Sequence, residues 1–228
     1  RNVTGVQTCA LPIYKWTYEV NVSQAKDAFD QEIARIQDIV PEAPVILAFG
    51  DVSNFRYAVY PQYKANRRKQ RRPAGFAVLK DWARSAWVSH SFPRIEGDDV
   101  VGIMNDGEDI IVSRDKDLRT IPGMHLVGDE LLTISKEEAN RTFYTQVLTG
   151  DTTDGYPGCP KIGPKKAAQL LEGCRTDEQF WFQVVMAYVE AGLDSTNALQ
   201  MARCARILRR GEYDVDKEQP ILWQPPTL

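Results

Sequence analysis

The chain has 228 residues, of which 43% are hydrophobic, enough to bury the core of one domain or of a domain with an appendage. No apolar run reaches the roughly 20 residues that span a bilayer, so no membrane segment is predicted. A net charge of −3 argues against a module that simply coats nucleic acid, because such domains are strongly basic. The four cysteines form no CxxC pair and lie far from both histidines, which disfavours zinc and disulfides and favours a reducing cytoplasm.

The first 13 residues are treated separately from the fold. The segment VTGVQTCALPI (3–13) looks like a translated sequencing adapter. It has neither the basic start nor the continuous apolar stretch of a signal peptide. We therefore expect residues 1–13 to be a non-native leader, in which case the natural N-terminus is missing.

Helices and strands are predicted to alternate along residues 14–150. Ser23 is a plausible N-cap for a helix that ends at Pro41, and the apolar run VILAF (45–49) is typical of a buried parallel strand. Further helices are predicted at 76–86, 96–104 and 135–147, the last with a capping box at Ser135 and Glu138, and strands at 87–90, 109–113 and 131–134. This alternation predicts an α/β fold with a mostly parallel central sheet. Residues 151–228 are predicted to contain only helices, which begin near Pro164 and include residues 180–188 and 198–208.

Acidic residues stand at the ends of these predicted elements. Asp51 follows the VILAF strand, where the active sites of open α/β sheets lie. Two carboxylates about 4 Å apart repel by about 4 kcal/mol at an effective dielectric near 20, so a converging set needs cations. A lone acid at a helix start is more often a cap, and the acids at 106, 108 and 109 are expected to be solvated. Acids at four separate element ends instead favour a site for hard divalent ions such as Mg²⁺. Besides Asp51, the candidate ligands are Glu96, Asp98, Asp99, Asp115, Asp117, Asp151 and Asp154.

The segment YKANRRKQRR (63–72) carries six basic residues in ten, with Pro61 and Pro73 at its borders. Such a run is usually a solvated segment or a phosphate-binding patch. Lys64 and the arginines would contact DNA phosphates, and Tyr63 could stack on a base.

A glycine-rich turn follows the last two acids. Gly158, Ile162 and Gly163 lie in a segment that resembles a helix-hairpin-helix element, in which backbone N–H groups point at phosphates. Lys165 and Lys166 add positive charge to the helix that follows. Neither a GxxxxGK[ST] loop nor a GxGxxG fingerprint occurs, which disfavours nucleotide-driven chemistry.

The motifs YKANR, EGDD, SRDKD, GDTTDG and IGPKKA occur in this order, and together they resemble the flap endonuclease and 5′–3′ exonuclease family, including its members from T-seven-like bacteriophages. The resemblance covers nearly everything from residue 43 to the C-terminus. It implies a PIN-like nuclease core at 14–150, a flexible basic arch at 61–74, and a DNA-binding region with a helix-three-turn-helix element at 151–228.

The resemblance also implies roles for individual residues. Two Mg²⁺ or Mn²⁺ ions would bind per active site, and a K⁺ ion could bind in the hairpin. The first metal would be held by Asp51, Glu96, Asp98 and Asp99, and the second by Asp115, Asp117, Asp151 and Asp154. Lys64 and Arg67 would be catalytic, and the DNA-binding set would be Tyr63, Lys64, Arg67, Arg68, Ile162, Gly163, Lys165 and Lys166.

The implied activity is hydrolysis of duplex DNA, or of RNA primer strands, from 5′ ends or flaps during phage DNA replication or degradation. The enzyme would be a monomer in the bacterial host's cytoplasm. The family carries an aspartate at the end of its first strand, and none precedes Ser23 here, so the chain as written is expected to be impaired.

Three alternatives stay open at this point. A catalytically inactive, structure-specific DNA-binding protein would fit the missing aspartate. A PIN-type endoribonuclease shares the acids but lacks a basic arch followed by a DNA-gripping hairpin. A phosphotransferase of the haloacid-dehalogenase type is the weakest alternative, because its DxD motif belongs on the first strand.

Overall fold

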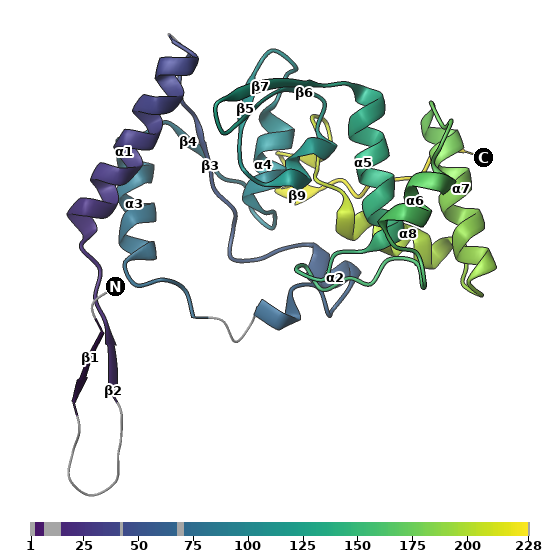
Figure 1. Ribbon diagram of the computed structural model, residues 1–228, viewed down its shortest axis with the longest axis horizontal. Coiled ribbons are helices and arrows are strands. Elements are labelled where there is room, and N and C mark those ends of the chain that lie inside the picture. The colour runs from purple at the N-terminus through teal and green to yellow at the C-terminus, as the bar shows by residue number, and fades with distance from the viewer. Residues whose placement is uncertain (1–2, 7–14, 42, 68–70, 228) are drawn as a thin grey trace, which may run out of the picture. The chain divides into compact units, whose positions relative to one another are not determined.

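The computed structural model describes residues 3–6, 15–41, 43–67 and 71–227, and it divides the chain into two compact units (Figure 1). The first unit comprises Arg1–Leu47 and Gln70–Ser89, and the second comprises Ala48–Lys69 and His90–Leu228. The domain boundary predicted at residue 150 falls inside the second unit.

The first unit contains a strand pair and two helices. β1 (Val3–Val6) pairs antiparallel with β2 (Lys15–Tyr18), so part of the predicted leader forms a strand, and residues 7–13 lie outside the described residues. α1 (Val22–Ile39) begins at Asn21, whose side chain accepts a hydrogen bond from the Gln24 amide at 3.1 Å. The predicted N-cap, Ser23, is therefore wrong by two residues.

The second helix of this unit, α3 (Phe76–Ala86), has the predicted bounds. It packs against α1 through an edge-to-face contact between Phe29 and Trp82, whose ring centroids are 5.6 Å apart. Each helix has apolar residues along one side, and the two apolar sides face each other.

Two short strands adjoin the division between the units. The Leu47 amide of β3 (Leu47–Ala48) donates to the Val88 carbonyl beside β4 (Ser89–His90), at 2.9 Å. In the described part of the chain this sheet has two strands, and the side chain of Ile46 is half exposed (50%). The fully buried strand predicted at 45–49 is therefore wrong in length and burial, because a two-stranded sheet covers little of it.

The second unit is built on a three-stranded sheet. β5 (Ile110–Val112) pairs parallel with β6 (Gly123–Val127), and β6 pairs antiparallel with β7 (Glu130–Ile134). Strand β6 was not predicted, and β7 begins one residue before its predicted start. Parallel pairing next to helices agrees with the predicted α/β class.

Helices make up most of the second unit. The capping box predicted at Ser135 and Glu138 is confirmed, with the Glu138 amide donating to the Ser135 hydroxyl at 3.2 Å. A short strand pair, β8 (Tyr213–Asp214) with β9 (Gln219–Pro220), corrects the expectation of helices alone after residue 150. The helices are α2 (Arg56–Val59), α4 (Gly97–Met104), α5 (Lys136–Thr149), α6 (Pro164–Leu170), α7 (Asp177–Glu190) and α8 (Ser195–Ala205), with 3-10 turns η1 (Ala65–Arg67) and η2 (Lys116–Thr120).

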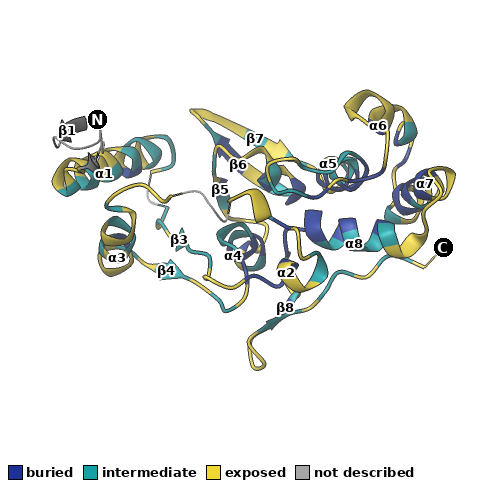
Figure 2. Ribbon diagram, turned by 90° about the horizontal axis from the view of Figure 1, so that it is seen from below, coloured by how far each residue is buried: buried dark blue, intermediate teal, exposed yellow. Residues whose placement is uncertain are grey.

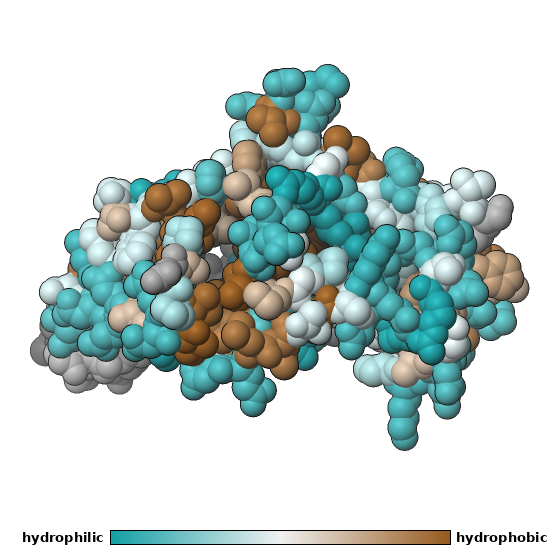
Figure 3. All heavy atoms as spheres, turned by 90° about the horizontal axis from the view of Figure 1, so that it is seen from above, coloured by the Kyte–Doolittle hydropathy of each residue, from teal (hydrophilic) through white to brown (hydrophobic). Residues whose placement is uncertain are grey.

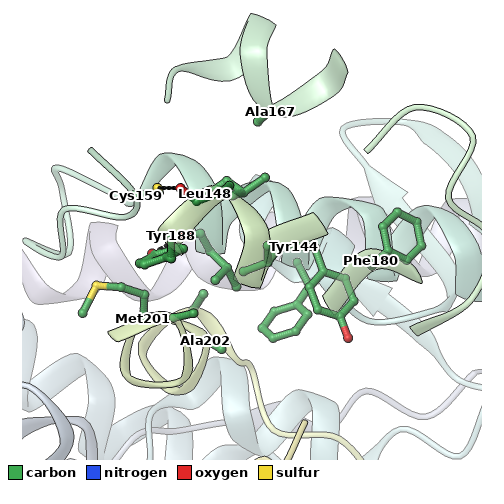
Figure 4. Close-up of a cluster of buried hydrophobic side chains, with 14 of the residues drawn as sticks. Tyr144, Leu148, Cys159, Ala167, Phe180, Tyr188, Met201 and Ala202 are labelled. Carbon is green, nitrogen blue, oxygen red and sulfur yellow. Dashed lines mark hydrogen bonds between the residues drawn. The ribbon is translucent and has the colours of Figure 1, made fainter. Parts of the chain in front are cut away.

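The largest hydrophobic core lies among α5, α7 and α8, whose facing sides are buried (Figure 2). Tyr144 and Phe180 stack with ring centroids 5.3 Å apart, and the Tyr188 hydroxyl donates to the Val147 carbonyl at 2.8 Å. The Cys159 amide donates to the Leu148 carbonyl of α5 at 2.8 Å, and the side chains of these two residues lie close together in Figure 4. This helical core anchors the turn that carries the last two predicted acids.

The segment after α8 lies directly against α4. A Cβ atom at Gly102 would lie 2.0 Å from the Leu208 carbonyl oxygen, so only glycine allows this approach. Ile207 and Leu208 enter two separate small cores. The acidic helix α4 is therefore held by the C-terminal part of the chain.

The described residues contain no helix that is both long and apolar enough to cross a membrane. Hydrophobic side chains interrupt a mostly hydrophilic face in Figure 3, and Val112, Met124 and Leu131 on the sheet are partly exposed. Scattered exposure of this kind is ordinary for a folded protein.

We predict that Gly158→Ala destabilises the second unit far more than Gly173→Ala. Both glycines have positive φ angles, +67° and +76°, so alanine adds about 1–2 kcal/mol of strain at either position. At Gly158 the new Cβ would also lie 2.2 Å from the Gly150 nitrogen, which adds about 1–3 kcal/mol of overpacking, whereas Gly173 faces open space. Urea unfolding measures both values, and equal losses would contradict the crowding argument.

Candidate active site

Three acids begin helix α4. Glu96 is the N-cap, and Asp98 and Asp99 lie in the first turn, where the helix dipole favours negative charge. The Asp99 carboxylate accepts a hydrogen bond from the Glu96 amide at 3.0 Å. The EGDD motif is therefore a helix start, as predicted, and it places three carboxylates on one turn.

Asp99 forms a buried ion pair. Its two oxygens accept from Nη1 and Nη2 of Arg56, both at 2.7 Å, and from the Leu208 amide at 3.0 Å. The side chain of Asp99 has no exposed surface. Both oxygens are thus occupied, and Asp99 is bound to a cation of the protein itself, which differs from the ligand role predicted for it.

Glu96 contacts the start of the basic segment. Lys64 Nζ donates to Glu96 Oε1 at 2.5 Å, and the Tyr63 hydroxyl lies 2.9 Å from Glu96 Oε2. Burial alone would raise the pKa of Glu96, but the positive charges of Arg56 and Lys64 bring it below its ordinary value. Glu96 is therefore a carboxylate.

The turn after α5 brings two more acids to the same place. Asp151 Oδ1 accepts from the amides of Thr153 and Asp154, at 2.6 and 3.0 Å, which closes the turn. Asp154 then contacts three side chains of the basic segment: Tyr63 at 2.8 Å, Arg67 at 2.8 Å and Lys64 at 3.5 Å. The sequence-predicted cations and the sequence-predicted acids therefore meet.

The backbone of the basic segment is docked on this turn as well. Lys64 has a positive φ of 50°, and its amide donates to the Asp154 carbonyl at 2.6 Å. Gly155, with φ of +75°, lies beneath it, since a Cβ there would come within 3.3 Å of the Gln62 carbonyl. The GDTTDG and YKANR motifs, nearly a hundred residues apart, thus form one structure.

Asp115 and Asp117 follow strand β5, as predicted. Asp115 accepts from the Asp117 amide at 3.0 Å and caps η2. Asp117 accepts from the side-chain amide of Gln146 on α5, at 2.7 Å. Asp115 is exposed and Asp117 is partly exposed, so both can reach a ligand.

The pKa values of Asp98 and Asp117 show that the acids of the site influence one another. Burial raises the pKa of Asp98 to about 6, with further contributions from the negative charges of Asp115 and Glu96. Burial likewise raises the pKa of Asp117 to about 6, with contributions from Asp115 and Asp151. Repulsion between the carboxylates adds to the effect of burial, so nearby cations balance the negative charge at Asp98 and Asp117 only in part.

The hydrogen bonds of Asp51 involve other residues than these acids. Its carboxylate accepts from the amides of Val52 and Arg94, at 2.7 and 2.8 Å, and from the Ser53 hydroxyl at 2.5 Å. The Arg94 amide is the main cause of its pKa falling to about 2. Asp51 thus ties its own loop to the backbone at Arg94, and no hydrogen bond joins it to another of the predicted acids among the described residues.

The structure corrects two predicted DNA contacts. Tyr63 is 2% exposed and stacks on Tyr156 at 6.3 Å, so its ring is not free to stack on a base. Ile162 is also buried in the helical core, which leaves the backbone of exposed Gly163 and the side chains of exposed Lys165 and Lys166 at the start of α6. Arg68 lies outside the described residues.

The donor chemistry of the site suits a hard divalent cation, because it consists of carboxylate oxygens. No group of three or more acids, histidines or cysteines within the described ranges already encloses an ion position. Lys64, Arg67 and Arg56 instead neutralise part of the acidic charge. Burial and neighbouring carboxylates raise the pKa of Asp98 and of Asp117, and a bound cation would relieve this crowding of negative charge.

Three residues of the site were missed by the sequence analysis. Arg56 and Gln146 each bind one of the predicted acids, and Tyr156 packs behind Tyr63. Arg56 lies between Phe55 and Tyr57, and this position was a signal in the sequence that it is buried with a charged partner, because a charge among apolar residues needs one. Gln146 and Tyr156 gave none.

No protein-family profile matches the chain. Among curated proteins it is 29% identical over 223 residues to the exonuclease of Escherichia phage T7, which covers 80% of this chain and 74% of that protein. It is also 29% identical over 155 residues to the flap endonuclease Xni of Shewanella sp. (strain MR-4), covering 60% of each.

Among solved structures the chain is similar to a bacteriophage T5 flap endonuclease in a pseudo-enzyme–product complex with DNA and metal ions. The TM-score is 0.56 with 13% sequence identity, and the match covers 78% of this chain and 82% of that one. This likeness confirms the predicted fold class.

We predict that Asp98→Asn stabilises the metal-free protein at neutral pH. Because the pKa of Asp98 rises from 3.8 to about 6 on folding, the folded state binds more protons between these values, and stability falls as pH rises from about 4 to about 6. At about 1.4 kcal/mol per pKa unit, the variant should gain about 1–3 kcal/mol at pH 7.5 and nothing below pH 4.

Urea unfolding in EDTA across this pH range measures the effect of Asp98→Asn. Asp106→Asn is the matched control, because that exposed carboxylate accepts a hydrogen bond from the Glu108 amide and its pKa is lowered. Equal responses of the two variants would rule out crowding of negative charge at Asp98.

Proposed function

We propose that the chain, which is similar to a phage exonuclease and to flap endonucleases, hydrolyses phosphodiester bonds of duplex DNA at 5′ ends and 5′ flaps, with divalent metal ions. The observation that carries the proposal is the meeting of two sets of side chains. Acids from α4, η2 and the turn after α5 lie beside Lys64 and Arg67 of the basic segment. Cation-binding and phosphate-binding groups are thus adjacent.

Six of the predicted acids are proposed to hold Mg²⁺ or Mn²⁺. Glu96 and Asp98 would act with Asp115 on one side, and Asp117 with the turn acids on the other; the set is Glu96, Asp98, Asp115, Asp117, Asp151 and Asp154. When bound, two such ions would polarise the phosphate and stabilise the charge that develops during hydrolysis. Asp51 and Asp99 are engaged with the protein itself and are proposed to shape the site.

Lys64 and Arg67 are proposed to bind the phosphate that is cut. Arg67 donates one hydrogen bond to Asp154 and is partly exposed, so its guanidinium can exchange this carboxylate for a phosphate, which it can bind with two parallel hydrogen bonds. Lys64 is held by Glu96 and Asp154, from which its ammonium can turn to a phosphate oxygen. Both then stabilise negative charge on the reacting group.

The remaining assignments follow the family resemblance. We propose that the Gly163 amide, Lys165 and Lys166 grip the DNA backbone next to the cut, with K⁺ binding in the same hairpin. RNA strands paired with DNA are proposed as further substrates. The protein is proposed to act as a monomer in the cytoplasm of a bacterial host, in phage DNA replication or degradation.

The test of the proposed function is cleavage of end-labelled 5′-flapped, nicked and single-stranded substrates in Mg²⁺ or Mn²⁺ and in EDTA. Enzyme is used in excess over the substrate, so that a single slow turnover is detected. Asp115→Asn combined with Asp117→Asn should lower the cleavage rate more than about 100-fold while DNA binding is retained. This loss exceeds the range expected when a residue only orients a metal ligand. Asp106→Asn combined with Asp109→Asn removes two exposed acids outside the site and should change neither property.

Binding without cleavage in either metal would identify a DNA-binding protein instead of an enzyme. Preference for single-stranded RNA would identify an endoribonuclease. Undiminished cleavage in EDTA would contradict the role of the metal.

We predict that Lys165→Ala combined with Lys166→Ala weakens binding to duplex DNA independently of its sequence. Each lysine lost from a phosphate contact should reduce the slope of log K against log salt by about 1. Fluorescence anisotropy at several salt concentrations gives this slope. Lys136→Ala combined with Lys217→Ala removes the same charge from exposed positions outside the hairpin, and an identical loss there would contradict a specific grip.

A further inference from the structure

We infer that Arg56 is a positioning residue that holds the acidic start of α4 in place for metal binding. The inference rests on the proposed function and assigns a role to a residue whose side chain is buried behind the site. Arg56 is 2% exposed, so its side chain is placed to act through its neighbours and not on DNA.

The Arg56 guanidinium joins three segments. It donates to both oxygens of Asp99 at 2.7 Å, to the Cys204 carbonyl at 3.0 Å and to the Arg206 carbonyl at 2.5 Å. Cys204 lies in α8 and Arg206 directly follows it, while Asp99 lies in α4. The start of α2, the first turn of α4 and the end of α8 are therefore tied at one group.

Asp99 passes this restraint to the acids beside it. Its carboxylate accepts from the amides of Glu96 and Leu208, both at 3.0 Å, in addition to its two bonds with Arg56. Four hydrogen bonds to one carboxylate fix its orientation, and with it the first turn of α4. Glu96 and Asp98 project from that turn, so their carboxylates depend on the same anchor.

Arg56 also lies close to Glu96 and to the ring of Tyr63. Its Nη1 is 3.5 Å from Glu96 Oε2, and its guanidinium lies 5.8 Å from the centre of the Tyr63 ring. The Tyr63 hydroxyl in turn contacts Glu96 and Asp154. The buried Arg56 therefore contacts Glu96 directly and lies behind Asp154 through the ring of Tyr63.

Lysine cannot replace this arrangement. The planar guanidinium matches a carboxylate with two parallel bonds and has donors left for two carbonyls, whereas an ammonium acts as a point charge on a flexible stem. Arg56→Lys keeps the buried positive charge but loses the fixed geometry. This separates positioning from simple charge neutralisation.

The chain supplies a matched control pair. Arg206 donates to Glu212 through Nε at 3.0 Å and Nη2 at 2.5 Å, and both side chains are largely buried. Glu212 lies outside the acidic site. Arg206→Lys therefore disturbs a similar ion pair in the same unit, and it keeps the Arg206 backbone carbonyl that accepts from Arg56, because the substitution changes only the side chain.

The experiment compares the full chain with Arg56→Lys, Arg56→Gln and Arg206→Lys. Mn²⁺ binding is measured by titration calorimetry without DNA, together with thermal unfolding, kcat and KM for a 5′-flapped duplex. Arg56→Lys should weaken Mn²⁺ binding by about 10–100-fold, the range for groups that orient metal ligands, and lower kcat with KM nearly unchanged. Arg206→Lys should lose thermal stability while its Mn²⁺ affinity stays that of the unaltered chain.

Unaltered Mn²⁺ affinity in Arg56→Lys would overturn the inference, as would an equal loss of affinity in Arg206→Lys. If Arg56→Gln does not fold, Arg56→Lys decides. If the unaltered chain neither binds Mn²⁺ nor cleaves DNA, the proposed function fails, and hydrogen exchange of the α4 amides still tests the positioning. Faster exchange in Arg56→Lys than in Arg206→Lys supports it, and equal exchange refutes it.

Discussion

The acidic site depends on interactions that offset the electrostatic repulsion between its carboxylates. At close range each added carboxylate opposes the next, so the acids can converge only where rigid elements and cations oppose the repulsion. The ion pair of Arg56 and Asp99 does this in the interior, where breaking one partner of such a pair destabilises a protein by about 3–5 kcal/mol. Lys64 and Arg67 do it at the surface, where exchange with a ligand is possible.

This division between buried and exposed cations links stability to function. A buried arginine with every partner fixed cannot move, so it sets geometry. Surface cations that pair with Glu96 and Asp154 balance the charge of the protein without bound ions and are placed to meet a phosphate. The PIN-like α/β core therefore supplies a site in which metal ions and DNA would replace contacts that the protein makes with itself.

Several features could be predicted because they are local. The capping box at Ser135, the helix at 76–86 and the EGDD helix start follow from short-range hydrogen bonds and apolar spacing. Strands were less predictable: β6 was missed, and VILAF proved half-buried, because strand burial depends on which neighbours pair with it. Tyr63 shows the same limit, since an aromatic residue in a basic segment is equally compatible with a base and with a core.

The sequence alone determined which residues could serve chemistry here: the carboxylates at element ends, the basic segment and the glycine hairpin, because residue type and spacing fix charge and local geometry. Only the tertiary structure decided which of them act together. It paired Asp99 with Arg56, withdrew Asp51 into its own loop and brought Lys64 to Glu96 and Asp154. These outcomes depend on contacts between segments tens of residues apart, and no local pattern specifies which distant partner a charged side chain will meet.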